Sequence, residues 1–280
     1  MLWPDHRASP TLGVRAIAGE RGTTVAGPGS NEVPAGTTAG IVVFDRRSNT
    51  FAERLNADAP FRSASVVKLL IALDHLWHRG PAFRLTPADR ARLELMLARS
   101  DDGAAGHYWD HNGRSAIITR MVTRLGLTGT AGPPPAFPEY WGYSALTAAD
   151  TVRIYRHLLD AAPDPVRELV MGGLRRCTRL GTDGFDQHFG IAAAFGQPWA
   201  VKQGWSGFPP SGRTAGADHV DLARPALHTT GTVGAGDRSV VAVLTLHPAG
   251  TPYTVTCSRV TALTRALDVP GAVRPVARPD

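Results

Sequence analysis

The hydrophobic pattern of the chain changes twice, and this order of patterns limits the possible folds more than any other feature. Apolar runs typical of buried strands occur towards both ends, and a block with helical spacing lies between them. Strands followed by helices and then by strands again favour one sheet with helices inserted into it. We therefore expect an α/β (α+β) protein with an antiparallel sheet flanked by helices and an inserted all-helical lobe. The cleft between the two parts is the expected ligand site.

The expected strands are short apolar runs bounded by turn residues. A Gly-rich turn at 234–237 joins the last two of them. This turn lacks the Gly-Lys-Ser/Thr ending of a phosphate loop, so its glycines indicate a hairpin. The predicted strands are Thr38–Asp45, Thr50–Asn56, Trp199–Gly204, Leu227–Val233 and Ser239–Leu246.

The expected helices fill the central block, and one more follows the last strand. Thr86 and Thr147 are the expected N-caps of two of them, each with an acidic residue in the first turn. The predicted helices are Ser65–Trp77, Thr86–Arg99, Gly103–Trp109, Arg114–Leu125, Thr147–Leu159, Asp164–Arg176 and Thr256–Leu267. The predicted organisation is an irregular lead-in at 1–36, a sheet lobe at 37–64 plus 190–280, and a helical lobe at 65–189.

The charge of the chain invites a nucleic-acid hypothesis, which the sequence does not favour. The net charge is +6, but the arginines are scattered and never stand more than two in a row. No apolar run approaches the roughly 18 residues of a membrane-spanning helix. No positively charged segment followed by an apolar one occurs at the start, which predicts a cytoplasmic location, or export if the sequence is a trimmed mature form. Cys177 and Cys257 have no metal or thioredoxin spacing, and whether they pair stays open.

Lysine is almost absent from this arginine-rich chain. Of the 30 basic residues, only Lys68 and Lys202 are lysines. Arginine does not give up its proton in proteins, whereas the pKa of a lysine amine moves readily. The two lysines are therefore candidates for proton transfer, and the alternative is that they merely survived a compositional bias.

Each lysine lies near a residue that is compatible with a catalytic or binding role. Ser65 precedes Lys68 by three residues at the start of an apolar helix, so the hydroxyl and the amine share one helix face. Amide groups at a helix N-terminus favour an oxyanion, and a nearby amine can take a serine proton. The alternative role of Ser65 is a simple N-cap. Lys202 lies in a predicted strand before Gly204, where a ligand can approach the backbone closely.

Three short motifs occur in the order found in one family of serine enzymes. They are Ser65-x-x-Lys68, Ser100-Asp101-Asp102 and Lys202-Gln203-Gly204. The chain thereby resembles the serine β-lactamases and penicillin-binding proteins, class A β-lactamases in particular, over about Thr38 to Leu267. The resemblance implies a β-lactamase/transpeptidase-like fold with its active site in the cleft between the lobes.

The resemblance also implies roles for individual residues. Ser65 would be the acyl-forming nucleophile, Lys68 its proton acceptor and Ser100 the relay of the proton to the leaving group. Lys202 would hold Ser100 and attract a substrate carboxylate. The backbone N–H groups of Ser65 and of Trp205, which follows Gly204, would form the oxyanion hole. No metal or other cofactor is implied, and His107 and His111 are read as ordinary helix residues.

Three departures from the family pattern affect the predicted activity. The segment Thr128–Ser144 is short, and its only carboxylate, Glu139, lacks the usual Leu-Asn that follows the water-activating Glu. Asp102 replaces an Asn, which places a charge near Lys68 that favours the protonated amine, or selects a substrate with a donor or a cation. Gln203 replaces a hydroxyl that helps to bind a carboxylate. Candidates to substitute for it are His228, Arg213 and Arg224.

These features predict a serine hydrolase or acyl transferase of class A β-lactamase-like fold that forms an acyl-enzyme on Ser65. Its partner would be a small amide, lactam or ester, with inefficient hydrolysis of β-lactams. The alternatives are a binding protein of this fold that has lost turnover, and a D-Ala-D-Ala peptidase. Nucleic-acid binding ranks last, and the oligomeric state stays open.

Overall fold

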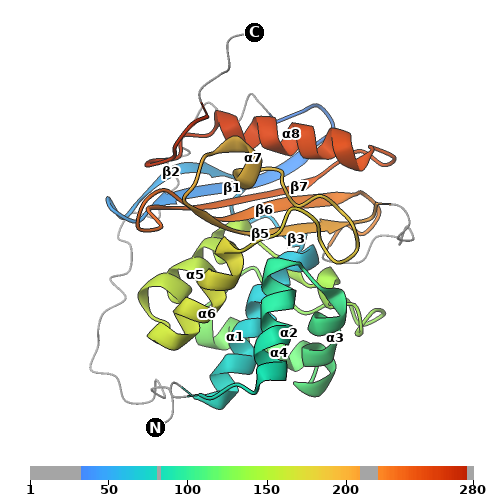
Figure 1. Ribbon diagram of the computed structural model, residues 1–280. Helices are drawn as coiled ribbons and strands as arrows, with labels where there is room; N and C mark the ends of the chain where they lie inside the picture. Colours follow the sequence, from blue (N-terminus) through green and yellow to red (C-terminus); the bar gives the residue numbers. More distant parts are fainter. Residues whose placement is uncertain (1–32, 81–82, 209–219, 276–280) are drawn as a thin grey trace.

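The structure is a computed structural model that describes residues 33–80, 83–208 and 220–275 (Figure 1). Most of the expected lead-in at 1–36, and Arg213, lie outside these residues. A five-stranded antiparallel sheet with the order β2-β1-β7-β6-β5 forms the middle layer. The strands are β1 (Thr38–Asp45), β2 (Thr50–Leu55), β5 (Trp199–Ser206), β6 (Ala226–Val233) and β7 (Ser239–Leu246).

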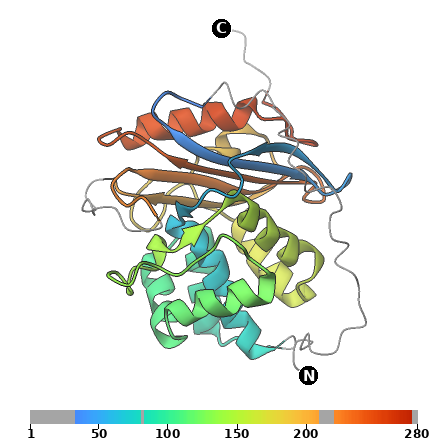
Figure 2. The same cartoon turned by 180° about the vertical axis from the view of Figure 1, so that it is seen from behind.

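Both faces of the sheet are covered, as Figures 1 and 2 show from opposite sides. One face packs against α7 (Ile191–Ala194) and α8 (Tyr253–Ala266), and the other packs against the larger group of helices. Successive residues of β1 point to opposite faces, so Val42 and Phe44 join one apolar cluster while Ile41 and Val43 join the other. This double burial explains why the strands read as continuous apolar runs.

The helical layer is built around α1, which is buried from Lys68 to Leu76. Inside this apolar helix Asp74 is completely buried and forms a two-point ion pair with Arg120, at 2.8 and 2.7 Å. The helices of the layer are α1 (Lys68–Arg79), α2 (Pro87–Ala98), α3 (Asp102–His111), α4 (Ser115–Leu125), α5 (Ala148–Asp160) and α6 (Asp164–Arg175).

The predicted α+β architecture with an antiparallel sheet is confirmed, and the differences are local. The predicted helix from Ser65 is in fact the short 3₁₀ turn η2 (Ala64–Val67) followed by α1. Thr86 and Thr147 are N-caps as expected. The sequence did not predict the short elements β3 (Phe61–Arg62), η3 (Trp141–Tyr143), β4 (Ala145–Leu146) and α7.

Three further expectations concern the lobe boundaries, the two cysteines and membrane spans. The lobe boundaries at 37–64, 65–189 and 190–280 stay a prediction. Cys177 and Cys257 are both free thiols. Within the described part of the chain, no helix is long and apolar enough to cross a membrane.

Candidate active site

Ser65 lies on η2, at the point where the chain leaves β3 and enters α1. It contributes to a cleft of about 530 Å³. The preceding residue, Ala64, has φ +46°, a conformation that costs a non-glycine residue about 1–3 kcal/mol and is concentrated at functional sites. On the other side, β5 is the edge strand of the sheet and runs past η2.

Gly204 of β5 makes this close approach possible. A Cβ atom built at Gly204 would lie 3.2 Å from the carbonyl oxygen of Ser63 and 3.3 Å from the amide nitrogen of Ser65. A side chain here would be in tighter contact than is usual, also with the Val66 side chain at 3.1 Å, so β5 or the turn that carries the serine would have to give by a few tenths of an ångström. The glycine of the third motif therefore has a packing reason that the structure shows directly.

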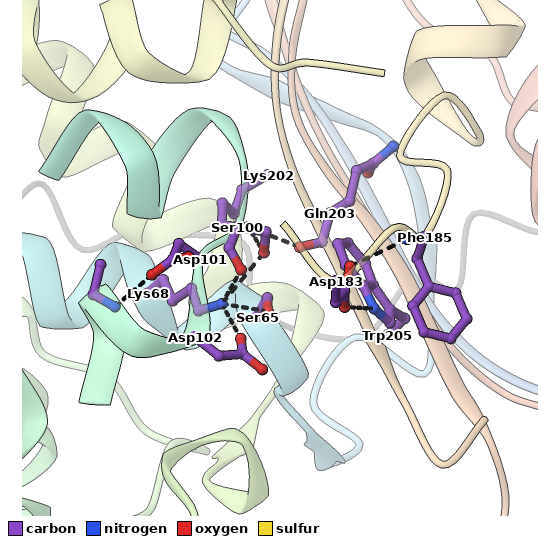
Figure 3. Close-up of polar contacts among 11 residues, drawn as sticks. Ser65, Lys68, Ser100, Asp101, Asp102, Asp183, Phe185, Lys202, Gln203 and Trp205 are labelled. Atoms are coloured by element: carbon purple, nitrogen blue, oxygen red, sulfur yellow. Dashed lines mark hydrogen bonds and ion pairs between the residues drawn. The ribbon is translucent and has the colours of Figure 1, made fainter. Parts of the chain in front are cut away.

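Lys68 is completely buried beneath Ser65, and its amine contacts both serines of the motifs (Figure 3). The Nζ atom lies 2.9 Å from Ser65 Oγ, 2.6 Å from the Ser100 carbonyl oxygen and 3.4 Å from Ser100 Oγ. It also lies 2.6 Å from Asp102 Oδ1 and 4.6 Å from the ring centre of Trp141. The amine is thus held by oxygen acceptors on one side and an aromatic face on another.

This set of contacts allows Lys68 to act as a base when it is neutral. A neutral amine has two N–H donors and one lone pair. The Ser100 carbonyl and the Asp102 carboxylate can only accept, so they take the two donors. The lone pair is then left for the hydroxyl proton of Ser65. Burial lowers the pKa of Lys68, and the nearby charge of Asp102 opposes this effect.

Ser100 connects the two lysines. Its hydroxyl accepts a hydrogen bond of 2.7 Å from Lys202 Nζ. Lys202 is also buried, and burial together with the charge of Lys68 lowers its pKa to about 7. Ser100 has φ +56°, a second strained backbone position beside the cleft. A continuous path of polar atoms therefore runs from Ser65 through Lys68 and Ser100 to Lys202.

The two aspartates that follow Ser100 make different contacts. The Asp101 side chain accepts a hydrogen bond from the amide of Ala104 and caps α3. Asp102 reaches Lys68 with one carboxylate oxygen, yet its side chain is 69% exposed and lines the cleft. Its charge therefore acts on the buried amine and on the open cleft together.

Two candidate binding residues are not brought to the cleft. The Gln203 amide turns away from Ser65 and donates to the carbonyl oxygens of Gln187 and Phe189 (Figure 3). His228 is fully buried, with one ring nitrogen 2.8 Å from the Arg62 carbonyl oxygen and the other accepting from a backbone amide of β7.

The candidate binding residue Arg224 does not line the cleft, whereas the candidate water activator Glu139 does. Arg224 pairs with Asp221 at 2.6 Å and is not among the residues that line the cleft. Glu139 does line the cleft, so its loop lies over the site that contains Ser65.

Most residues of the cleft wall were not predicted from the sequence. Trp205 was expected only for its backbone, but its indole N–H donates to Asp183 Oδ2 at 2.9 Å, and both residues line the cleft. η3 and the residue before it add aromatic rings, with Tyr140 and Tyr143 stacked at 5.1 Å. The cluster of aromatic residues around Glu139 was the available sequence signal for this wall.

Comparison with solved structures defines the class of protein. A PBP-A structure superposes with a TM-score of 0.60 at 16% identity, over 83% of this chain and 89% of that one. A class A β-lactamase from Mycobacterium abscessus gives 0.59 at 19% identity, over 82% and 92%. The fold is therefore that of the class A β-lactamases and penicillin-binding proteins, as the sequence predicted. No family model matches the chain.

Sequence comparison then gives the particular family. The chain is 32% identical over 247 residues to the protein named "Putative lipoprotein LppW" of Mycobacterium tuberculosis, which covers 86% of this chain and 72% of that protein. The Mycobacterium bovis protein of the same name matches equally well. The chain belongs to this LppW family.

The family corrects one expectation. A cytoplasmic location was predicted from the absence of a visible secretory segment, and this prediction is wrong. The relatives are named lipoproteins, which indicates exported or membrane-anchored proteins. The composition and motifs of the folded part hold no information on this point, because export depends on a separate targeting segment.

Proposed function

We propose that this protein is a serine hydrolase or acyl transferase that forms an acyl-enzyme on Ser65 with a small amide, lactam or ester. The observation that carries the proposal is the 2.9 Å contact between Ser65 Oγ and the buried Lys68 amine, which in its neutral form has a lone pair for the hydroxyl proton. A PBP-A variant of the same fold is described as an acyl-enzyme complex with penicillin G, which supports this chemistry for the fold.

In the first half of the reaction, Ser65 Oγ attacks the substrate carbonyl carbon and its proton passes to the neutral Lys68 amine. The tetrahedral intermediate carries a negative oxygen. When it collapses, the bond to the leaving group breaks, and the leaving group takes a proton from Ser100 Oγ. Lys68 returns its proton to Ser100 over the 3.4 Å contact, and Lys202 holds that hydroxyl in place.

The oxyanion would be stabilised by the amides of Ser65 and Trp205. In an antiparallel edge strand, every second residue points its N–H and C=O away from the sheet. The Gln203 carbonyl oxygen accepts from the Lys202 amine at 3.1 Å and so faces the site. Trp205 is two residues further along β5, so its N–H points to the same side, towards Ser65.

The second half of the reaction transfers the acyl group to water or to another nucleophile. Glu139 is the carboxylate of the cleft loop and is the candidate to activate water. Its side chain is exposed, with no described partner that fixes it over Ser65. We therefore expect slow deacylation, and a Glu139→Gln variant with an acyl-enzyme that lasts longer.

A second candidate is a binding protein of this fold without turnover. The 2.6 Å contact between Lys68 and Asp102 favours it, because a carboxylate at this distance stabilises the protonated amine, which cannot accept the Ser65 proton. In that case ligands would occupy the cleft reversibly.

Intact-protein mass spectrometry tests the proposal. The protein is incubated with a fluorophosphonate, a penicillin and a nitrophenyl ester, alongside Ser65→Ala and a Ser258→Ala control, which removes an exposed hydroxyl of α8. We expect a mass gain in the native protein and the control, and none in Ser65→Ala. Absence of any gain with all three probes, or an equal gain in Ser65→Ala, would refute an acyl-enzyme on Ser65.

A further inference from the structure

The wall of the cleft has an unusual charge for a site that faces substrate. Its lining contains three carboxylates, Asp102, Glu139 and Asp183. Among the described residues, the lining contains no Lys, Arg or His. The two lysines lie beneath this surface, each at most 1% exposed, and are bonded to the serines and to backbone oxygens. Among the described residues, the side chains at the surface of the cleft therefore present three carboxylates and no cation to an entering substrate.

The same wall is aromatic. Six lining residues carry rings, and they come from two separate segments, from β5 and from the chain just after β5: Tyr140, Trp141, Tyr143, Phe185, Trp205 and Phe208. The faces of such rings attract cations, most strongly where water is partly excluded. The Trp141 ring centre already lies 4.6 Å from the amine nitrogen of Lys68. The rings and the carboxylates are thus two independent features that favour the same kind of ligand.

The carboxylates are placed on both sides of the nucleophile. Asp102 stands next to Lys68, and Asp183 is held by the Trp205 indole on the β5 side, with Ser65 between them in the view of Figure 3. The second oxygen of Asp183 accepts from the backbone amide of Phe185 at 3.2 Å, so this carboxylate is fixed in position. A cation on a substrate acylating Ser65 would lie within the reach of these charges.

We propose that the substrates of this site carry a positive charge, as an ammonium or quaternary ammonium group, on the acyl donor. This inference rests on the proposed acyl-enzyme chemistry and names its substrate class. The same wall disfavours donors with a free carboxylate near the scissile bond, which includes penicillins and peptides that end in D-Ala-D-Ala. No described side chain at the surface of the cleft offers such a carboxylate an ion pair.

Three nitrophenyl esters of equal length test the proposal, differing only at the end of the acyl chain: trimethylammonium, tert-butyl or carboxylate. The first two groups have the same shape, so their comparison isolates the charge. Each kcat/KM is divided by the uncatalysed rate of the same ester. We expect this normalised kcat/KM to be about tenfold higher for the trimethylammonium ester than for the tert-butyl ester at low salt. The reason is that several exposed charge contacts each contribute a factor of about two to five. The preference should shrink at 0.5 M NaCl, because salt screens exposed charges.

Charge variants show whether the acids of the cleft cause the preference. In Asp183→Asn and Glu139→Gln, the ratio of trimethylammonium to tert-butyl kcat/KM should fall about threefold each. Glu168→Gln on α6 removes the same charge from an exposed residue outside the cleft, and its ratio should equal that of the native protein. An unchanged ratio in both cleft variants, or a native ratio near one or below, would overturn the proposal.

Binding to Ser65→Ala separates this inference from the proposed function. Amide analogues of the trimethylammonium and tert-butyl esters are titrated into that variant by calorimetry. Preferential binding of the cationic amide supports the inference even if no ester is turned over, in which case only the acyl-enzyme proposal fails. Turnover that depends on Ser65 without any cation preference in rate or binding overturns only the inference.

Discussion

The buried amine of Lys202 should make the stability of the fold depend on pH in a defined window. Burial and the charge of Lys68 lower its pKa from 10.5 to about 7. In the unfolded chain the amine keeps a proton up to pH 10.5, whereas in the folded protein it loses the proton near pH 7. The unfolded state therefore binds more protons between these values, and stability rises with pH. Below pH 7 the folded state bears the full cost of a buried ammonium.

The magnitude follows from the displacement of the pKa. Each pH unit is worth about 1.4 kcal/mol per group, so Lys202 alone should raise the free energy of unfolding by about 1.5 kcal/mol between pH 7 and 8.5. Lys68, whose pKa is also lowered by burial, acts in the same direction. The other displaced groups act outside this window. Three buried histidines with a pKa of about 4 change the stability below this window: His75, His228 and His247. Burial raises the pKa of Cys177 and Cys257, which change the stability above about pH 9.

Urea unfolding at pH 7.0, 7.5, 8.0 and 8.5 measures this rise, which corresponds to about 0.5 M in the midpoint for a slope of about 3 kcal/mol per M. In Lys202→Met the rise should be smaller by about 1.5 kcal/mol, while the exposed control Arg90→Met should retain the native rise. The test uses the change in the free energy of unfolding between pH 7.0 and 8.5, and not its value at one pH. The substitution also removes hydrogen bonds to Ser100 and to the Gln203 carbonyl, at a cost that does not vary with pH. A flat native profile, or an equal rise in Lys202→Met, would refute the buried-lysine argument.

Three further perturbations have expected outcomes. Gly204→Ala should reduce the rate of fluorophosphonate labelling of Ser65 about tenfold and lower the urea-derived stability by about 1–3 kcal/mol, because the new methyl group would lie 3.1–3.3 Å from atoms of the serine turn, which would have to shift. Asp74→Asn should cost about 2–4 kcal/mol in the same unfolding assay, since it leaves two arginines of α4 without their buried partner. Asp102→Asn should move the acidic limb of the labelling rate to lower pH, because the lost charge no longer raises the pKa of Lys68; a limb that stays in place or moves to higher pH would contradict this.

The helices and strands could be predicted because their signals are local. Thr86 and Thr147 cap their helices through hydrogen bonds to backbone amides three residues ahead, which depend on no distant part of the chain. The motif serines and lysines could be predicted as a set from a family resemblance. Their distances could not, because Lys202 and Ser100 are 102 residues apart and meet only through packing.

The errors also have physical causes. Gln203 was considered for the cleft although it directly follows Lys202 in a strand, where neighbouring side chains point to opposite faces. Since Lys202 points to Ser100, Gln203 had to point away, and its amide bonds to Gln187 and Phe189 carbonyls instead. This correction was available from the sequence. The pairing of Asp183 with Trp205 was not, because a loop contributes the acid.

Buried arginine and buried lysine differ in their protonation around the cleft. Arg62 is also buried, 1% exposed, and donates to the carbonyl oxygens of Ser206, Asp221 and Arg224. Burial lowers its pKa to about 10, so it stays charged at neutral pH and serves as a permanent cation that holds loops together. The same burial brings the pKa of Lys202 to about 7, where one amine can both give and accept a proton. Arginine at Lys68 would keep the charge but could not take the Ser65 proton, so the proposed chemistry needs lysine at this position.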